Sequence, residues 1–294
     1  MPDHLSNYYA GLREQTEAAR REPPTTHDLI NRALTEPDEN KAWEAVSTLD
    51  FRATHEVFEE ARKLCRSECP QERRLGADIL GQLGIPDRLC PDECAAILAE
   101  MSAIETDLEA LGAICTALGH LHHPDTVEPL LRWKRHPDAE IRWHVAVSLG
   151  GHEEPDAVEA LIELSTDPDE DVRDWATFGL GSRMDLDTPR IREALCDRLN
   201  DPDPVTRAEA FVGLARRKDE RVIAPLIEAL DSTQLDEYEP RQDLVLEAVE
   251  EMADPRLLPS LLAMRERKNS EWIEEIIQRC RNKMAAGVVT SDES

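Results

Sequence analysis

Six of the nine histidines lie close together in the chain, and acids beside them could complete a metal site. The segments GHLHHPD (119–125) and GGHEEPD (150–156) are similar and would form equivalent loops of a repeated structure. Imidazole and carboxylate groups are common ligands of divalent metal ions. The candidate ligands are His122, His123, His152 and Glu153. No short motif fixes their spacing, so ordinary exposed loop histidines are the alternative.

The cysteines include two pairs with four-residue spacing, Cys65 with Cys69 and Cys90 with Cys94. On one helix this spacing directs both thiols the same way. Zinc sites usually have closer cysteines in loops, and cysteine is a common small core residue. We therefore expect structural burial. The odd total of seven cysteines, with no apolar leader, predicts a cytoplasmic protein with reduced thiols.

Motifs for catalysis and cofactor binding are absent from the sequence. It contains no glycine-rich phosphate loop, no G-x-S-x-G and no H-E-x-x-H. We therefore predict no catalytic residues and no cofactor, and a protein that is not an enzyme.

The charge balance limits the kind of partner. Sixty-two acids against 34 bases give a formal net charge of -28. Nucleic-acid binding needs clustered Lys and Arg, and anionic membranes also repel such a surface. No run approaches the length of a membrane span. The composition favours a basic protein partner and disfavours nucleic acid and membrane.

One phrase recurs along the chain. DPDEDVRDWATFGLG (167–181) resembles HPDAEIRWHVAVSLG (136–150), which lies 31 residues earlier. Aligning further segments gives a final apolar column at regular intervals, and this regularity indicates a repeat architecture. The column consists of Leu49, Leu80, Leu118, Leu149, Leu180, Leu214 and Ala248.

Each phrase predicts a helix, and a second helix follows it. In Asp-Pro-Asp an acid caps free backbone amides and proline suits the first turn. Val172, Ala176 and Leu180 then share one helical face. Because one helix pair cannot bury its apolar face alone, we predict an all-α solenoid of about seven stacked pairs. We expect the second helices to line its concave wall.

The phrase resembles the HEAT repeat family, and most closely its PBS-lyase-like variety, over residues 25–267. The resemblance implies that the acid and arginine of each phrase form a structural ladder along the stack. These residues are Asp167, Arg173, Asp201, Arg207 and Arg142. Ladder interruptions are expected at His136, Ala42 and Leu111, which depart from the pattern.

The predicted array has distinct ends. We expect an N-terminal capping helix in residues 1–24, the repeats in 25–267, a C-terminal capping helix in 268–286 and a disordered tail in 287–294. With both ends capped, the protein is expected to be a monomer.

Two tryptophans occupy repeat positions that hold polar residues in neighbouring repeats. Together with adjacent polar side chains they could form an amphipathic spot, because binding surfaces favour aromatic anchors. The predicted partner-binding residues are Trp143, His144, Asp174, Trp175, Arg132 and Arg135. The alternative is that both rings fill gaps between repeats.

We therefore predict a non-catalytic scaffold or adaptor for a basic protein, with an inhibitor or immunity-type protein as a special case. Similarity to bilin lyase subunits implies, as an alternative, an enzyme or chaperone of tetrapyrrole attachment. The DNA-glycosylase branch of HEAT-like proteins is a further alternative, but its basic concave face is not evident here.

Overall fold

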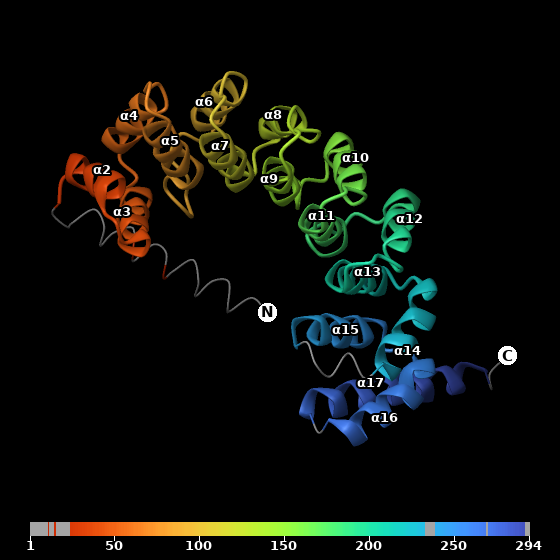
Figure 1. Cartoon of the computed structure of the whole chain (residues 1–294). Helices are drawn as coiled ribbons and strands as arrows, with labels where there is room; N and C mark the ends of the chain where they lie inside the picture. The colour runs from red at the N-terminus through yellow and green to blue at the C-terminus, as the bar shows by residue number, and fades with distance from the viewer. Residues whose placement is uncertain (1–10, 12–14, 16–23, 233–238, 269, 292–294) are drawn as a thin grey trace. The chain divides into compact units, whose positions relative to one another are not determined.

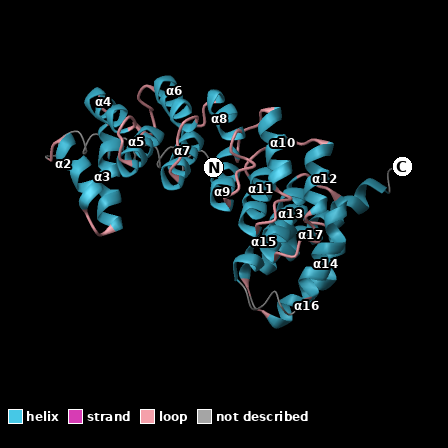
Figure 2. Cartoon of the chain, turned by 45° about the horizontal axis from the view of Figure 1, so that its top comes forward, coloured by secondary structure: helices cyan, strands magenta, loops and turns pink. Residues whose placement is uncertain are grey.

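The computed structural model describes residues 11, 15, 24–232, 239–268 and 270–291. Within these residues the chain forms helices and connecting loops and contains no strand (Figure 2). The helices group into two compact units, residues 1–149 and 150–294. The all-α solenoid prediction is confirmed.

The first unit contains four helix pairs in its described part. Its elements are α2 (Thr26–Thr35), α3 (Glu39–Arg52), α4 (His55–Leu64), α5 (Pro70–Gln82), α6 (Pro91–Ser102), α7 (Leu108–Leu121), the 3₁₀ turn η1 (Pro124–Thr126), α8 (Val127–Leu131) and α9 (Ala139–Leu149).

The second unit continues the same alternation. Its elements are α10 (Pro155–Leu164), α11 (Glu170–Ser182), α12 (Pro189–Asp197), α13 (Pro204–Arg216), η2 (Glu220–Val222), α14 (Ile223–Asp231), α15 (Glu239–Met252), η4 (Pro255–Leu257), α16 (Leu258–Arg267) and α17 (Glu271–Ser291).

The recurring phrase begins α11 and α13 through an acidic cap. The Asp169 carboxylate accepts from the backbone N–H groups of Asp171 and Val172, and Asp203 does the same for Thr206. The capping residue is thus the second acid of Asp-Pro-Asp. Pro168 precedes the cap and does not lie in the first turn, which corrects that detail of the prediction.

The predicted apolar column forms the centre of each helix pair. All seven of its residues have no exposed surface, so burial explains why the column recurs.

Small residues bring the odd-numbered helices close together. A Cβ on Gly119 of α7 would lie 2.6 Å from the Ser148 Cβ of α9, and a Cβ on Gly213 of α13 would lie 2.6 Å from the Gly181 Cα of α11. We call the odd-numbered helices α3 to α15 the inner row, because within each unit they lie on the inner side of the curve (Figure 1). Within each unit the phrase helices therefore lie on the inner side of its curve. The expectation for the second helices was wrong, because the small residues lie in the phrase.

The N-terminal capping helix predicted for residues 1–24 lies almost entirely outside the described residues. The C-terminal helix α17 extends to Ser291, so 287–291 are helical where a tail was expected. No proline follows residue 286 to end the helix.

Candidate partner-binding surface

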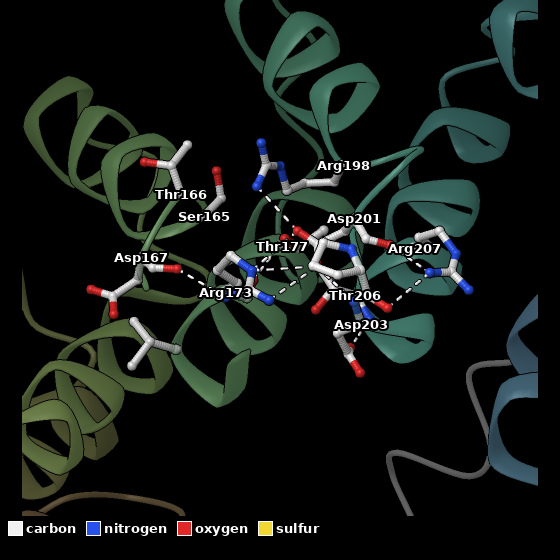
Figure 3. A network of polar contacts seen from close by, with 12 residues as sticks. Ser165, Thr166, Asp167, Arg173, Thr177, Arg198, Asp201, Asp203, Thr206 and Arg207 are labelled. Carbon is white, nitrogen blue, oxygen red and sulfur yellow. Dashed lines mark hydrogen bonds and ion pairs between the residues drawn. The ribbon is translucent and has the colours of Figure 1, made fainter. Parts of the chain in front are cut away.

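Arg173 links two successive repeats of the second unit (Figure 3). Its Nε and Nη2 donate to the Asp201 carboxylate at 3.1–3.3 Å, and its Nη1 donates to the carbonyls of Asp167 and Pro168. Both Arg173 and Asp201 are buried, with 9% and 3% of their surface exposed. Hydrogen bonding to Asp201 raises the Arg173 pKa. This pair fixes one inner-row helix against the next.

The other ladder arginines contact the turn before their own helix in the way that Arg173 does through its Nη1. Arg207 Nη1 donates to the carbonyls of Asp201 and Pro202. Arg142 Nη1 donates to the His136 carbonyl at 2.8 Å, also within its own repeat. These contacts tie each helix to the turn before it.

The first unit contains a ladder pair that the sequence analysis missed. Arg73 donates to both Glu105 carboxylate oxygens at 2.7 and 2.8 Å, and the Glu105 side chain is almost fully buried. Glu105 lies as far before Leu118 as Asp167 lies before Leu180, so the repeat alignment contained the signal. Glutamate in place of aspartate, and Thr106 in place of proline, obscured it.

The predicted metal ligands have other contacts inside their own units. His123 Nε2 lies 3.2 Å from an Asp92 oxygen. Glu153 accepts from the backbone N–H groups of Asp185 and Leu186. In the part of the chain that is described, no group of three His, Cys, Asp or Glu side chains is arranged to hold a metal ion. His122 and His152 lie in separate units, so the structure defines no joint site for them.

Burial, which was expected for the paired cysteines, applies to one member of each pair. Cys65 ends α4, and Cys69 is the cap residue before α5, so a turn separates the two thiols. Cys65 and Cys94 are buried, whereas Cys69 is exposed. Burial raises the pKa of the Cys65 and Cys94 thiols to about 12, which makes both inert as nucleophiles.

His144 is a packing residue of the first unit. Its ring fills the space above Gly112, where a Cβ would lie 2.7 Å from Nε2, and its Nδ1 lies 2.9 Å from Thr116 Oγ1. Burial lowers the pKa of His144. The ring thus packs α9 against α7. Trp143 beside it is half-buried, with its ring edge-on to His144 at 4.9 Å.

The two predicted arginines lie away from the inner row. Arg132 caps α8 and donates to Glu128 at 2.9 Å, as an ion pair along one helix. Arg135 lies in the turn after α8. Neither residue lies on the helix that carries Trp143.

Asp174 and Trp175 lie side by side on α11. Trp175 is 37% exposed, and its ring packs edge-on against Phe178 at 5.6 Å. Asp174 Oδ1 is buried without a hydrogen-bond partner. Burial, followed by the charges of neighbouring acids, raises the Asp174 pKa to about 6.

Glu209 on α13 is a second unpartnered acid, which the sequence analysis missed. It is only 7% exposed, and its Oε2 has no hydrogen-bond partner. Burial raises its pKa to about 8, with the charges of Asp174 and Glu247 as further causes. Glu209 is the one acid between Pro204 and Arg216, and its position in the repeat phrase does not by itself distinguish it from a solvated glutamate.

Trp43 on α3 is the most exposed of the large apolar side chains after Ile104, at 48%. It lies as far before Leu49 as Trp143 lies before Leu149, so the repeat alignment could have identified it. The exposed tryptophans Trp43 and Trp175 both belong to the inner row.

Comparison with known proteins agrees with this architecture. The family model for HEAT repeats matches residues 95–181, 160–239 and 192–279, which together exceed half of the chain. Protein YibA of Escherichia coli (strain K12) is 28% identical over 244 residues, 81% of this chain and 84% of YibA.

Solved structures show the same fold. The crystal structure of E. coli YibA superposes with a TM-score of 0.70 at 25% identity, over 90% of this chain and 95% of YibA. Importin beta, at 13% identity, has a TM-score of 0.51 over 92% of this chain and 42% of its own length, a likeness of fold alone. In the part of this chain that is described, no helix is long and apolar enough to cross a membrane. The repeats, the inner row and the family match agree, and the chain belongs to the HEAT repeat family.

Proposed function

We propose that this HEAT repeat protein is a non-catalytic scaffold that binds a basic protein through its inner row. The observation that carries the proposal is the exposed Trp175 ring next to Asp174, whose buried oxygen has no hydrogen-bond partner. An aromatic anchor beside an unneutralised acid is suited to a partner that offers apolar and cationic groups together.

The net charge supports the same partner chemistry. At -28 the protein attracts basic surfaces over distances of about a Debye length, roughly 8–10 Å at ordinary ionic strength. Such attraction raises association rates and selects the sign of the partner, while buried anchors set the affinity. Trp43 extends the aromatic character of the inner row to the first unit.

Inhibition is the special case of this function. A dense negative surface can occupy the basic cleft of an enzyme and exclude its substrate. In that case the captured basic protein loses activity when the purified chain is added in stoichiometric amount.

The test is capture of partners from the native host on immobilised protein, with elution by a salt gradient. Parallel columns carry Trp43→Ala, Trp175→Ala and an unrelated protein of similar negative charge. We expect a basic protein that is retained by the wild type, released by salt, and retained less by Trp175→Ala.

Two results would contradict the proposal. Retention of the same proteins by the charge-matched control would mean that binding is non-specific. Retention of partners with no basic bias, unaffected by salt and by both substitutions, would mean that another surface and another chemistry are used.

A further inference from the structure

We propose that Arg207 and the pocket beside it bind a small apolar monocarboxylate, an ionised carboxylic acid with an aryl or alkyl body. This site goes beyond the proposed function, because it takes a small anion and not a basic protein. All of its residues belong to the second unit and lie on or beside α13, α14 and α15.

Arg207 makes the same local contacts as the paired ladder arginines. The Nη1 atoms of Arg73, Arg173 and Arg207 each donate to two carbonyls of the turn before their own helix (Figure 3). The Nε and Nη2 of Arg73 then donate to the Glu105 carboxylate of the next repeat. Those of Arg173 donate to Asp201 in the same way. The edge formed by Nε and Nη2 is therefore the carboxylate-binding edge of a ladder guanidinium.

The same edge of Arg207 has no carboxylate. Within the residues that the structure describes, Arg207 makes no ion pair, and its hydrogen bonds come from Nη1 alone. The position of the ladder acid in the next repeat, counted back from Ala248, holds Leu235. Leucine supplies no carboxylate, so this edge of Arg207 is available to a ligand.

A pocket of about 380 Å³ adjoins Arg207. It extends to Val245 of α15, the next inner-row helix, and to residues of α14. Ala208, Phe211 and Val245 line it and are almost fully buried, so these walls are apolar. Small-molecule sites commonly have volumes of about 300–1,000 Å³, with apolar walls and a few polar groups that orient the ligand. The pocket can therefore hold the apolar body of a ligand whose carboxylate reaches Arg207.

The acids at the pocket limit the charge of the ligand. Asp201 lines the pocket, but its carboxylate already accepts from Arg173 and Arg198. Glu228 of α14 also lines it, is exposed, and makes no ion pair in the described part of the chain. A single cation opposed by an exposed acid favours one negative charge on the ligand over two. The repulsion from Glu228 should weaken the binding of a monocarboxylate without preventing it.

The test measures binding of phenylbutyrate to the full chain by isothermal titration calorimetry at neutral pH. Phenylbutanamide has the same shape without the charge, and acetate has the charge without the apolar body. Arg207→Gln removes the cation, whereas Ala229→Phe fills the pocket from α14. The matched control is Ala224→Phe, at an exposed position of the same helix.

We expect wild type and Ala224→Phe to bind phenylbutyrate with equal affinity. Arg207→Gln should bind at least about tenfold more weakly, because a charge-assisted contact is lost. Ala229→Phe should abolish binding although Arg207 keeps its contacts with the preceding turn. Glu228→Gln should bind about threefold more tightly, because the repulsion is removed. A gain of affinity cannot result from a damaged fold.

The comparison ligands separate the two parts of the site. Phenylbutanamide and acetate should each bind at least about tenfold more weakly than phenylbutyrate, because each lacks one of the two contacts. Absence of saturable phenylbutyrate binding would overturn the proposal, as would equal affinity for the amide.

The variants give further results that would contradict the site. Equal affinity in wild type, Arg207→Gln and Ala229→Phe would mean that phenylbutyrate binds elsewhere. Weaker binding by Glu228→Gln would contradict the assigned charge of the ligand. Each of these results would overturn the pocket and leave the proposed binding of a basic protein untouched, because that proposal rests on other residues.

Discussion

Arg173 of one repeat and Asp201 of the next are joined by a buried ion pair, in which the guanidinium donates to both carboxylate oxygens. Asp201 also accepts from the backbone N–H of Asp203 at 3.0 Å and from Arg198 at 3.1 Å. One carboxylate therefore joins a turn and two arginines, and its loss would affect adjacent repeats together.

We expect Arg173→Ala to lower the free energy of unfolding by about 3–5 kcal/mol, because it leaves the buried Asp201 without its main partner. The control is Arg190→Ala, which removes an exposed pair with Glu159 and should leave the free energy of unfolding nearly unchanged. Urea unfolding followed by circular dichroism measures both. Equal losses would show that burial of the ladder pair has no special weight.

The close contact of α11 and α13 predicts opposite effects for two glycines. Gly213→Ala should destabilise by about 1–3 kcal/mol, because its Cβ would lie 2.6 Å from Gly181 and 2.9 Å from Leu195. Gly179→Ala meets its neighbours only at 3.4 Å and should be neutral or stabilise by up to about 1 kcal/mol through helix propensity. Thermal unfolding of the two variants measures both effects. A lower melting temperature for Gly179→Ala than for Gly213→Ala would contradict the packing described for α11 and α13.

His144 is expected to contribute to folding. Thr116→Val removes its hydrogen-bond partner and should cost about 1 kcal/mol, and His144→Ala should cost more because a cavity opens above Gly112. Burial lowers the folded pKa of His144, so this contribution is present above the unfolded pKa and is lost as pH falls. Unfolding measured at pH 5 and 8 tests the sign. Unchanged stability in both variants would contradict the packing role of His144.

Glu209 makes the opposite pH prediction. Its folded pKa of about 8 exceeds the unfolded value of 4.5, so the folded state holds the extra proton and stability falls as pH rises between these values. The slope from one such group is at most about 1.4 kcal/mol per pH unit. Glu209→Gln cannot ionise, so its stability advantage over wild type should grow from pH 5 to 8. An advantage independent of pH would show that Glu209 is not protonated in this range.

Much of the architecture could be predicted from the sequence because the signals that define each helix lie within a few residues of it. The acidic caps act on amides two or three residues away, and the apolar column has one spacing along a helix. These signals involve residues close together in the chain. The recurrence of the phrase along the chain then identified successive copies of the same helix pair.

The sequence by itself determined the helix pairs, the buried leucine column and the places of the ladder arginines, since all depend on short-range periodicity. Only the tertiary structure showed that phrase helices line the inner row, that the ring of His144 fills the space above Gly112, and that Glu209 is buried without a partner. These features depend on how closely neighbouring helices pack. An acid in contact with solvent and an acid covered by the next repeat have the same letter in the sequence, and only packing gives them different free energies.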